Sequence, residues 1–200
     1  HDSSDSLVSS SGASLMSLGH GSRIGTGSPR RAALLMFHRP DLDVVEIRGN
    51  VDTRIRKVDE GMYDAVVLAT AGLFRLGLED RISEKLGVRE FPPAPGQGAL
   101  AVQMRDEDSE LHRVVKSLDD PDARATSGAE RAFLRGLGGG CTLPVGAHAW
   151  RESGQLKLLG FVGSNTGSLS LRAEVTGDDP EALGEKLAAQ MLSDGAGELL

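Results

Sequence analysis

The sequence contains a single cysteine, Cys141, among 200 residues, which excludes an internal disulfide framework and is typical of a reducing compartment. Aromatic residues make up only 4% of the chain, so the core must consist mainly of Leu, Val, Ala and Ile. No apolar run approaches the roughly 18 residues that a membrane span requires. Residues 1–20 contain no Lys or Arg and therefore lack the basic start of a signal peptide. We expect a cytoplasmic protein that makes no membrane contact.

The net charge of −7 argues against a nucleic-acid partner, which would attract a basic protein. Residues 23–57 nevertheless carry eight bases and four acids. A cationic segment in an acidic protein favours a small polyanionic ligand.

Strand-like and helix-like segments alternate between residues 22 and 76, which predicts a parallel, right-handed α/β unit. The Ser-rich opening as far as Leu18 resembles a tail or linker, and the proline cluster at residues 91–98 predicts a hinge. Three strands and a closing helix then indicate a small α+β domain. The predicted strands are residues 23–26, 43–48, 64–68, 99–104, 145–150, 155–162 and 168–175, and the predicted helices are 29–38, 51–60, 71–76, 108–118, 123–137 and 180–192.

Two successive strand ends carry arginines. Arg30 and Arg31 enter the first turn of a helix behind the N-cap Ser28, where the helix dipole disfavours cations, and Arg48 and Arg54 repeat this arrangement. Ligands of open α/β sheets bind at such ends. Any one of these arginines is most simply explained as a surface or ion-pairing residue, but four together favour an anion site. The nearby glycines lack the spacing of a dinucleotide fingerprint.

Cys141 follows three glycines, which would allow another group to approach its sulfur closely. A small buried cysteine in a turn explains the residues equally well. A cysteine–histidine hydrolase would need a nearby base. His148 is the nearest histidine in sequence, but its strand favours a packed side chain.

Five strings resemble motifs of the porphobilinogen deaminase (hydroxymethylbilane synthase) family. They occur in family order and cover the chain from about residue 5 onward; Gly27 departs from the serine of some members. The strings are TGSPRR at 26–31, RGNVDTR at 48–54, AGLFRLGL at 71–78, PGQGA at 95–99, and GGCTLPVG at 139–146 preceded by Glu130-Arg131.

The resemblance implies an α/β fold in which a lobe like those of type II periplasmic binding proteins precedes a small α+β domain with a three-stranded sheet. Residues 1–3 would be a tail from domain 1, 4–94 domain 2, 95–120 a hinge and return segment of domain 1, and 121–200 domain 3. The first half of domain 1 and the family's catalytic aspartate have no counterpart in this sequence. We therefore assign no catalytic residue and expect the 200-residue chain alone to be inactive.

The resemblance also implies a transferase that condenses four porphobilinogens, with loss of ammonia, into hydroxymethylbilane for haem biosynthesis. Chain growth would start from a dipyrromethane cofactor in thioether linkage to Cys141. By resemblance, Arg30, Arg31, Arg48 and Arg54 would hold carboxylates of the cofactor or growing chain. Arg75 would bind the substrate end, and Thr26, Ser28 and Gly98 would line the cofactor pocket. We expect a monomer and no metal site.

Two alternatives remain open at this point. A non-enzymatic anion-binding module of the periplasmic type predicts no covalent adduct, whereas a cysteine-nucleophile transferase predicts thiol-sensitive activity without a bound pyrrole. An intact mass spectrum separates the anion-binding module from the deaminase, because only the deaminase would carry a covalent adduct on Cys141.

Overall fold

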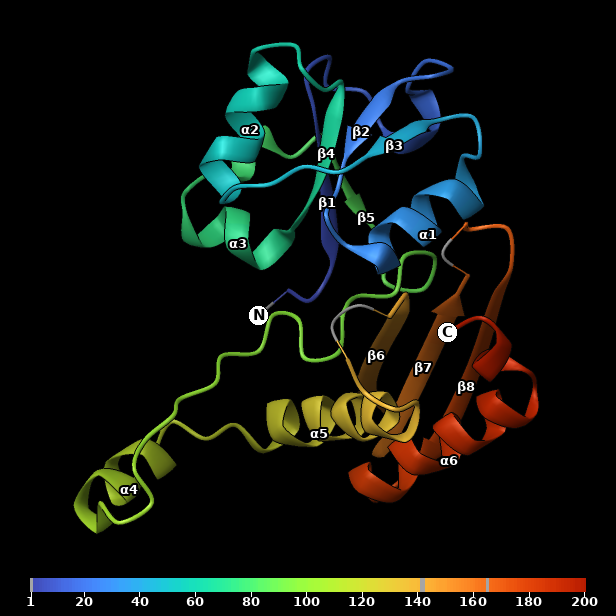
Figure 1. Ribbon diagram of the computed structural model, residues 1–200. Helices are drawn as coiled ribbons and strands as arrows, with labels where there is room; N and C mark the ends of the chain where they lie inside the picture. The colour runs from blue at the N-terminus through green and yellow to red at the C-terminus, as the bar shows by residue number, and fades with distance from the viewer. Residues whose placement is uncertain (1, 141–142, 165) are drawn as a thin grey trace.

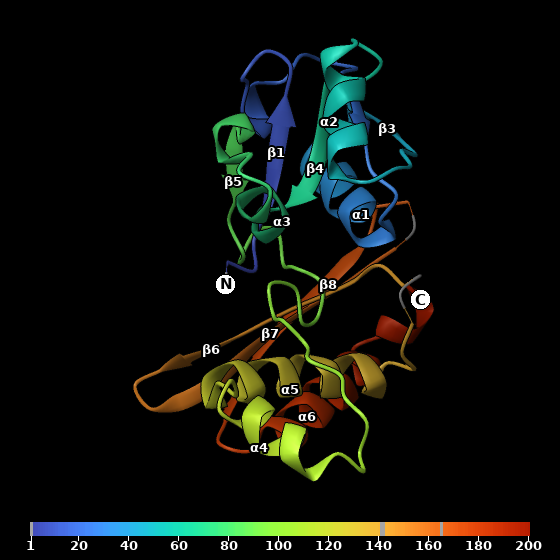
Figure 2. The ribbon, with the colours of Figure 1, turned by 90° about the vertical axis from the view of Figure 1, so that its left-hand side faces the viewer.

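The computed structural model describes residues 2–140, 143–164 and 166–200, which form two stacked lobes (Figures 1 and 2). The first lobe contains a five-stranded sheet in the order β3-β2-β4-β1-β5. The second contains a three-stranded antiparallel sheet in the order β6-β7-β8. The protein therefore has a mixed α/β fold, as the sequence predicts.

The first lobe is built on the predicted alternation of strands and helices. Strand β2 is parallel to both β3 and β4, which confirms the parallel unit, whereas β1 runs antiparallel to β4 and β5. The elements are β1 (Asp5–Ser9), β2 (Arg23–Gly25), α1 (Pro29–His38), β3 (Asp43–Val45), α2 (Val51–Asp59), β4 (Ala65–Ala69), α3 (Thr70–Arg75) and β5 (Glu84–Leu86), with 3₁₀ turns at Leu15–Ser17 and Glu79–Arg81.

Two N-caps fix where the first helices begin. The Oγ atom of Ser28 accepts the Arg31 N–H at 3.4 Å, and the Oδ1 atom of Asn50 accepts the Thr53 N–H at 2.9 Å. Each cap satisfies one of the N–H groups that a helix leaves unpaired at its start. Helices α1 and α2 therefore begin where their sequences predict.

The prediction that the opening segment is a tail was wrong. Strand β1 lies between β4 and β5, and all five of its residues are buried. Two of its serines can be buried because their hydroxyls have partners: Ser4 and Ser6 both hydrogen-bond Thr70, at 2.8 and 2.7 Å. Leu7 and Val8 supply its apolar contacts. Strand β5 was also not predicted.

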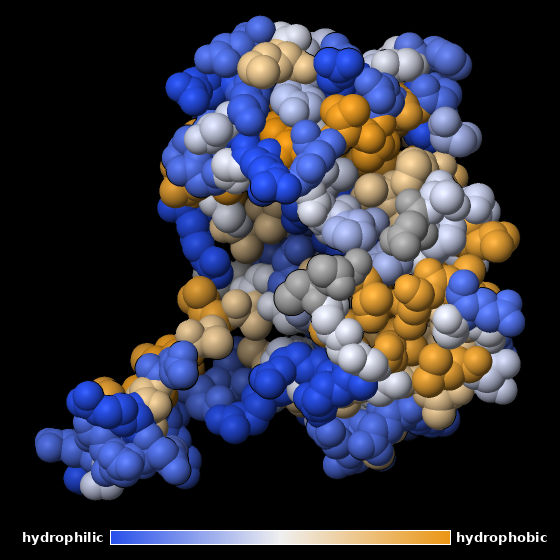
Figure 3. All heavy atoms as spheres, in the orientation of Figure 1, coloured by the Kyte–Doolittle hydropathy of each residue, from blue (hydrophilic) through white to orange (hydrophobic). Residues whose placement is uncertain are grey.

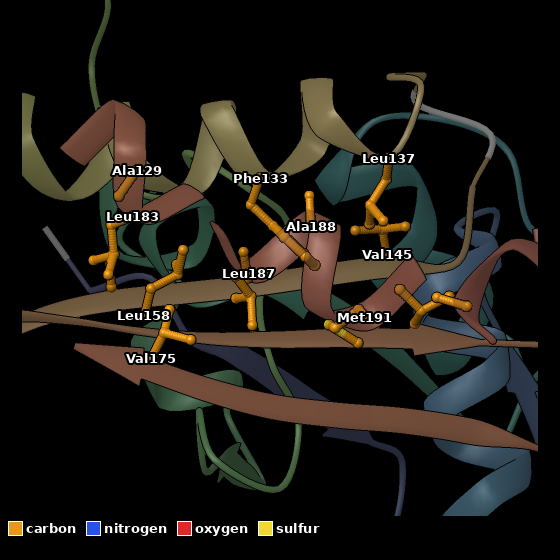
Figure 4. Close-up of a cluster of buried hydrophobic side chains, with 14 of the residues drawn as sticks. Ala129, Phe133, Leu137, Val145, Leu158, Val175, Leu183, Leu187, Ala188 and Met191 are labelled. Carbon is orange, nitrogen blue, oxygen red and sulfur yellow. The ribbon is translucent and has the colours of Figure 1, made fainter. Parts of the chain in front are cut away.

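The second lobe packs α5 (Pro121–Gly136) and α6 (Pro180–Ser193) on one face of β6 (Val145–Glu152), β7 (Gln155–Gly163) and β8 (Ser170–Gly177), with a 3₁₀ turn at Ala196–Glu198. Figure 4 shows Phe133, Leu187 and Met191 meeting between these layers. The two helices approach closely at Gly184, where an added Cβ would lie 2.4 Å from that of Ala132. Close packing of this kind requires a glycine there.

The lobes contact each other through the face of the second sheet opposite α5 and α6. Phe161 of β7 is fully buried in the core beneath α1, beside Leu34 and Phe91. Arg172 of β8 donates to the carbonyl oxygens of Arg89 and Glu90, each at 2.9 Å.

Residues 99–118 extend away from both lobes (Figure 1). The predicted strand at 99–104 is absent, and Leu100 and Val102 are exposed (66% and 59%) because no neighbouring strand pairs with them. The predicted helix is present as α4 (Ser109–Lys116), which buries none of its residues. Hydrophobic side chains are visible along this arm in Figure 3. None of the helices in the described part of the chain is long and apolar enough to cross a membrane.

Candidate functional site

One edge of the five-stranded sheet collects several polar groups. Strands β2 and β4 are parallel, so α1 and α3, which follow them, both begin at this edge. Strand β1 runs in the opposite direction and therefore starts there, with Asp5 in register with Ala69 at the end of β4. The sheet topology thus brings the first residue of β1 to the N-terminus of α1.

Asp5 is completely buried and binds both arginines of α1. Its Oδ2 atom accepts from Arg30 Nη2 at 2.8 Å, and its Oδ1 atom accepts from Arg31 Nη2 at 2.7 Å and Nε at 3.1 Å. Gln97 adds a further donor, with Nε2 2.8 Å from Oδ1. A buried carboxylate with this many donors is fully satisfied.

The two arginines differ in how far solvent reaches them. Arg30 is 3% exposed, and its Nη1 atom donates to the Pro92 carbonyl oxygen at 2.7 Å. The side chain of Arg31 is 12% exposed and its Nη1 atom donates to the Val67 carbonyl oxygen at 3.2 Å. Arg30 therefore faces the interior, and Arg31 is the arginine of this pair nearer to solvent.

The protonation of Asp5 follows from these contacts. Burial alone would raise its pKa, but the charges of Arg30 and Arg31 and the hydrogen bonds of Arg31 and Gln97 outweigh burial, so the pKa lies below the ordinary value. The carboxylate is ionised at neutral pH and neutralises one of the two guanidinium charges. The negative charge that the sequence argument assigned to a ligand is thus supplied in part by the protein.

Arg54 adds a second positive charge near Arg31. Its Nε atom donates to the Gly49 carbonyl oxygen at 2.8 Å, and within the described ranges it forms no ion pair. Partial burial lowers the pKa of Arg54, and the charge of Arg31 lowers it further. Two guanidinium groups that repel each other favour an anion between them.

Two predicted pocket hydroxyls lie at the same turn. The Oγ1 atom of Thr26, a buried residue, accepts the Ser28 N–H at 3.2 Å, and Ser28 caps α1. Both oxygens act as acceptors in these contacts, so each retains an O–H that can donate to a ligand. Thr26, Ser28 and Arg31 share this turn, and the charge of Arg31 acts on Arg54; we call these four residues the arginine edge.

The side chains of Arg48 and Arg75 have other surroundings in the structure. The side chain of Arg48 is 86% exposed and pairs with Glu46 at 2.8 Å. Arg75 is exposed and lines a separate hollow of about 360 Å³ together with Asp2, Phe74 and Lys85.

Gly98 lines a cavity of about 290 Å³ between the lobes. Its φ of +85° favours glycine, and an added Cβ would lie 2.8 Å from the Asp2 carbonyl oxygen.

Glu130 of α5 and His148 of β6 line the same cavity. Burial raises the pKa of Glu130 to about 7, although the Gly96 and Ala149 N–H groups oppose the shift. Burial lowers the pKa of His148, and the Arg89 charge adds to the effect.

Cys141 lies outside the described residues. The three glycines before it have φ angles of +96°, +67° and +123°, which only glycine adopts readily. After it, the Pro144 carbonyl oxygen accepts the Gly163 N–H at 3.0 Å, and Gly163 packs against Ala33 of α1. The chain therefore resumes beside the helix that carries Arg31.

Sequence reasoning did not single out Asp5 and Glu130 as functional groups. Asp5 stands in a Ser-rich segment whose pattern gives no sign of burial, and its partners follow 25 residues later. Glu130 lies on α5 and is one of 29 acidic residues in the sequence, among which spacing alone does not distinguish it. The motif string around it was the only available signal.

Comparison with known proteins gives two family matches. Residues 1–113 match the family described as porphobilinogen deaminase, dipyromethane cofactor binding domain, and residues 125–193 match porphobilinogen deaminase, C-terminal domain. Among curated proteins, the porphobilinogen deaminase of Roseiflexus castenholzii is 50% identical and matches 100% of this chain. That of Desulforudis audaxviator is 47% identical over 98% of the chain, and that of Stenotrophomonas maltophilia is 48% identical over 100%.

These relatives are longer than this chain. The matched region covers 66% of the Roseiflexus protein, 64% of the Desulforudis protein and 67% of the Stenotrophomonas protein. The chain therefore spans about two thirds of the length of the curated relatives it matches.

Proposed function

Because the chain belongs to the porphobilinogen deaminase family, we propose that it acts in tetrapyrrole synthesis as hydroxymethylbilane synthase. This transferase condenses four porphobilinogen molecules, with loss of ammonia, into a linear tetrapyrrole. The observation that carries the proposal is the arginine edge, where Arg31 and Arg54 stand together with only one charge of the Arg30–Arg31 pair neutralised by Asp5.

The chemistry of the substrate suits this edge. Porphobilinogen carries an acetate and a propionate, so a growing chain presents two carboxylates per ring. Guanidinium groups bind carboxylates through two parallel hydrogen bonds. Arg31 and Arg54 would hold such carboxylates, and the Thr26 and Ser28 hydroxyls would donate to them. Arg30 would act from the interior, by fixing Asp5 and thereby Arg31.

The remaining assignments are proposals of the same kind. Arg48 is exposed enough to turn toward a long polyanionic chain, and Arg75 would bind the substrate end from the hollow beside Lys85. Gly98 would leave space at the pocket wall. The proposal keeps the division of the chain that the resemblance implies: domain 2 at 4–94, a hinge and return segment of domain 1 at 95–120, and domain 3 at 121–200. It also includes a lobe like those of periplasmic binding proteins, a monomeric state and a cytoplasmic location.

The residues around Cys141 fit a covalently attached dipyrromethane group. Three glycines with positive φ precede the thiol, and among the described residues no atom lies within 4 Å of an added Cβ on Gly138 or Gly139. The group would supply a fixed primer for chain growth through a thioether. The chain's part is to hold the carboxylates of this group at Arg31 and Arg54.

Incubation of the whole protein with porphobilinogen tests the proposal. We expect ammonia release and, after cyclisation in acid and oxidation, uroporphyrin I. The alternative of a non-enzymatic anion-binding module predicts porphobilinogen binding without either product. Binding without turnover would contradict the proposal.

A further inference from the structure

Glu130 connects the second lobe to the turn at residues 95–98. The residue is 6% exposed, and its Oε2 atom accepts the Gly96 N–H at 2.7 Å. Its Oε1 atom accepts the Ala149 N–H of β6 at 2.8 Å. One carboxylate therefore joins α5, β6 and the turn.

The turn needs such an external contact. Gly96 and Gly98 have φ angles of +77° and +85°, and glycines resist ordering more than other residues. The internal hydrogen bonds of the turn are the Gln97 N–H to the Ala94 carbonyl oxygen at 2.9 Å and the Ala99 N–H to the Gly96 carbonyl oxygen at 3.2 Å. Above its pKa of about 7, Glu130 is ionised and supplies a charge-assisted acceptor, which is stronger than a neutral one.

The 95–98 turn also places Gln97 beside the Asp5–Arg31 pair. The Gln97 Nε2 atom lies 2.8 Å from the Ser3 carbonyl oxygen and 2.8 Å from Asp5 Oδ1. The same oxygen of Asp5 accepts both hydrogen bonds from Arg31. A continuous series of contacts thus runs from Glu130 through the turn to Arg31.

We propose that Glu130 is a positioning residue: by holding the 95–98 turn against β6 it fixes Gln97, and through Gln97 it fixes the Asp5–Arg31 pair that receives the substrate's carboxylates. The last part of this inference rests on the proposed function. Burying a carboxylate costs free energy even when it accepts two N–H groups, and burial raises the pKa of Glu130 to about 7. Only a carboxylate offers two equivalent acceptor oxygens, because a glutamine amide has a single one.

The first test measures amide hydrogen exchange in the 200-residue chain. Glu130→Gln must turn an NH₂ group toward one backbone N–H, so we expect exchange at Gly96 or Ala149 to rise by about tenfold or more. Leu158 in the centre of β7 should not change. Glu181→Gln is the matched control, because Glu181 is exposed and pairs with Arg135. Unchanged exchange at both amides would overturn the proposal.

The second test measures KM and kcat for porphobilinogen in the holoenzyme, which is the protein with its dipyrromethane group attached. A displaced Arg31 should raise the KM for porphobilinogen by about tenfold while kcat falls less than about threefold. A merely structural role would reduce the amount of active enzyme, lowering apparent kcat at unchanged KM, and this result would overturn the proposal.

A further variant keeps the proposal testable if Glu130→Gln fails to fold. Gln97→Leu leaves Glu130 paired, so it should reproduce the KM increase without faster exchange at Gly96; an unchanged KM would contradict the proposed series of contacts. If the wild-type holoenzyme makes no hydroxymethylbilane, the proposed function fails, and the exchange experiment still decides whether Glu130 holds the turn.

Discussion

Arg31 donates two hydrogen bonds to a single carboxylate oxygen of Asp5, from Nη2 at 2.7 Å and from Nε at 3.1 Å. The pair explains how arginines can stand in the first turn of α1, where the helix dipole disfavours them. The compensating acid comes from a strand 26 residues earlier in the chain and is held by the register of β1 on β4. The arginine edge is therefore prearranged around an internal anion.

Removal of the Asp5 charge should destabilise the protein strongly. Asp5→Asn leaves Arg30, which is 3% exposed, without a counter-ion, and breaking a buried pair from one side costs about 3–5 kcal/mol. Urea unfolding measures the change. The control Asp59→Asn removes an exposed partner of Arg81 and should cost less than about 1 kcal/mol. Equal losses in the two variants would show that Asp5 is not the counter-ion we describe.

Arg54 should matter for binding and little for stability. Arg54→Leu in the holoenzyme removes a carboxylate contact of about 1.5–3 kcal/mol, so we expect KM for porphobilinogen or cofactor loading to worsen by about tenfold or more. The unfolding free energy should change by less than about 1 kcal/mol, because Arg54 has no ion pair within the described residues.

Arg56→Leu is the matched control for this experiment. Arg56 lies on the same helix, and its side chain is 67% exposed and 3.8 Å from Glu60. It should leave turnover unchanged. Wild-type kinetics and full cofactor content in Arg54→Leu would contradict the role of the arginine edge.

Stability should depend on pH through Glu130 and Asp5 in opposite directions. The pKa of Glu130 rises from 4.5 to about 7 on folding, so the folded state holds its proton more tightly, and stability is lost as pH rises through this window. The loss amounts to about 3 kcal/mol. The pKa of Asp5 is depressed, so its contribution is present above its ordinary value of 3.8 and is lost as pH falls below it.

The difference between wild type and Glu130→Gln isolates the first effect. His148 has a lowered pKa and acts in the opposite direction below its ordinary value of 6.5, but it is common to both proteins. We expect the wild type to lose unfolding free energy relative to Glu130→Gln between pH 4.5 and 7. If the unfolding free energies of the two proteins change in parallel with pH in this range, Glu130 is ionised in the folded protein at acid pH.

Much of the fold could be predicted from the sequence because local signals agreed. The caps Ser28 and Asn50, the apolar run of β4 and the alternation of strands and helices are short-range features, and all were confirmed. Strand β1 was missed because Ser6 within it and Ser4 just before it are buried against Thr70, more than sixty residues away. A local pattern does not show such partners.

The same limitation explains the wrong strand at 99–104 and the incomplete site. Leu100 and Val102 alternate with other residues as in a strand, but a strand needs a neighbouring strand to form its hydrogen bonds, and none pairs with them. The arginines at strand ends could be found from spacing, whereas Asp5 as their partner depends on sheet register. The register of β1 on β4 could not be predicted from the sequence.

In the 200-residue chain on its own, the exposed arm at 99–118 should promote self-association at high concentration, whereas the monomeric state is proposed for the whole protein. Leu100, Val114 and Leu118 are 66%, 59% and 69% exposed, and exposed apolar patches favour association. Replacing all three with glutamine should reduce the apparent mass in light scattering at high concentration. The midpoint of urea unfolding should not fall, because these side chains are not buried. A lower midpoint, or association that the substitutions leave unchanged, would contradict this prediction.

The most direct measurement of the central claim is the intact mass of the whole protein expressed in cells that make porphobilinogen. We expect wild type to carry the added mass of a dipyrromethane group and Cys141→Ser to have the mass of the bare polypeptide. Cys141 is the only thiol in the sequence, so the assignment is unambiguous. A wild-type protein with no added mass, or a Cys141→Ser variant with the same adduct, would contradict the account.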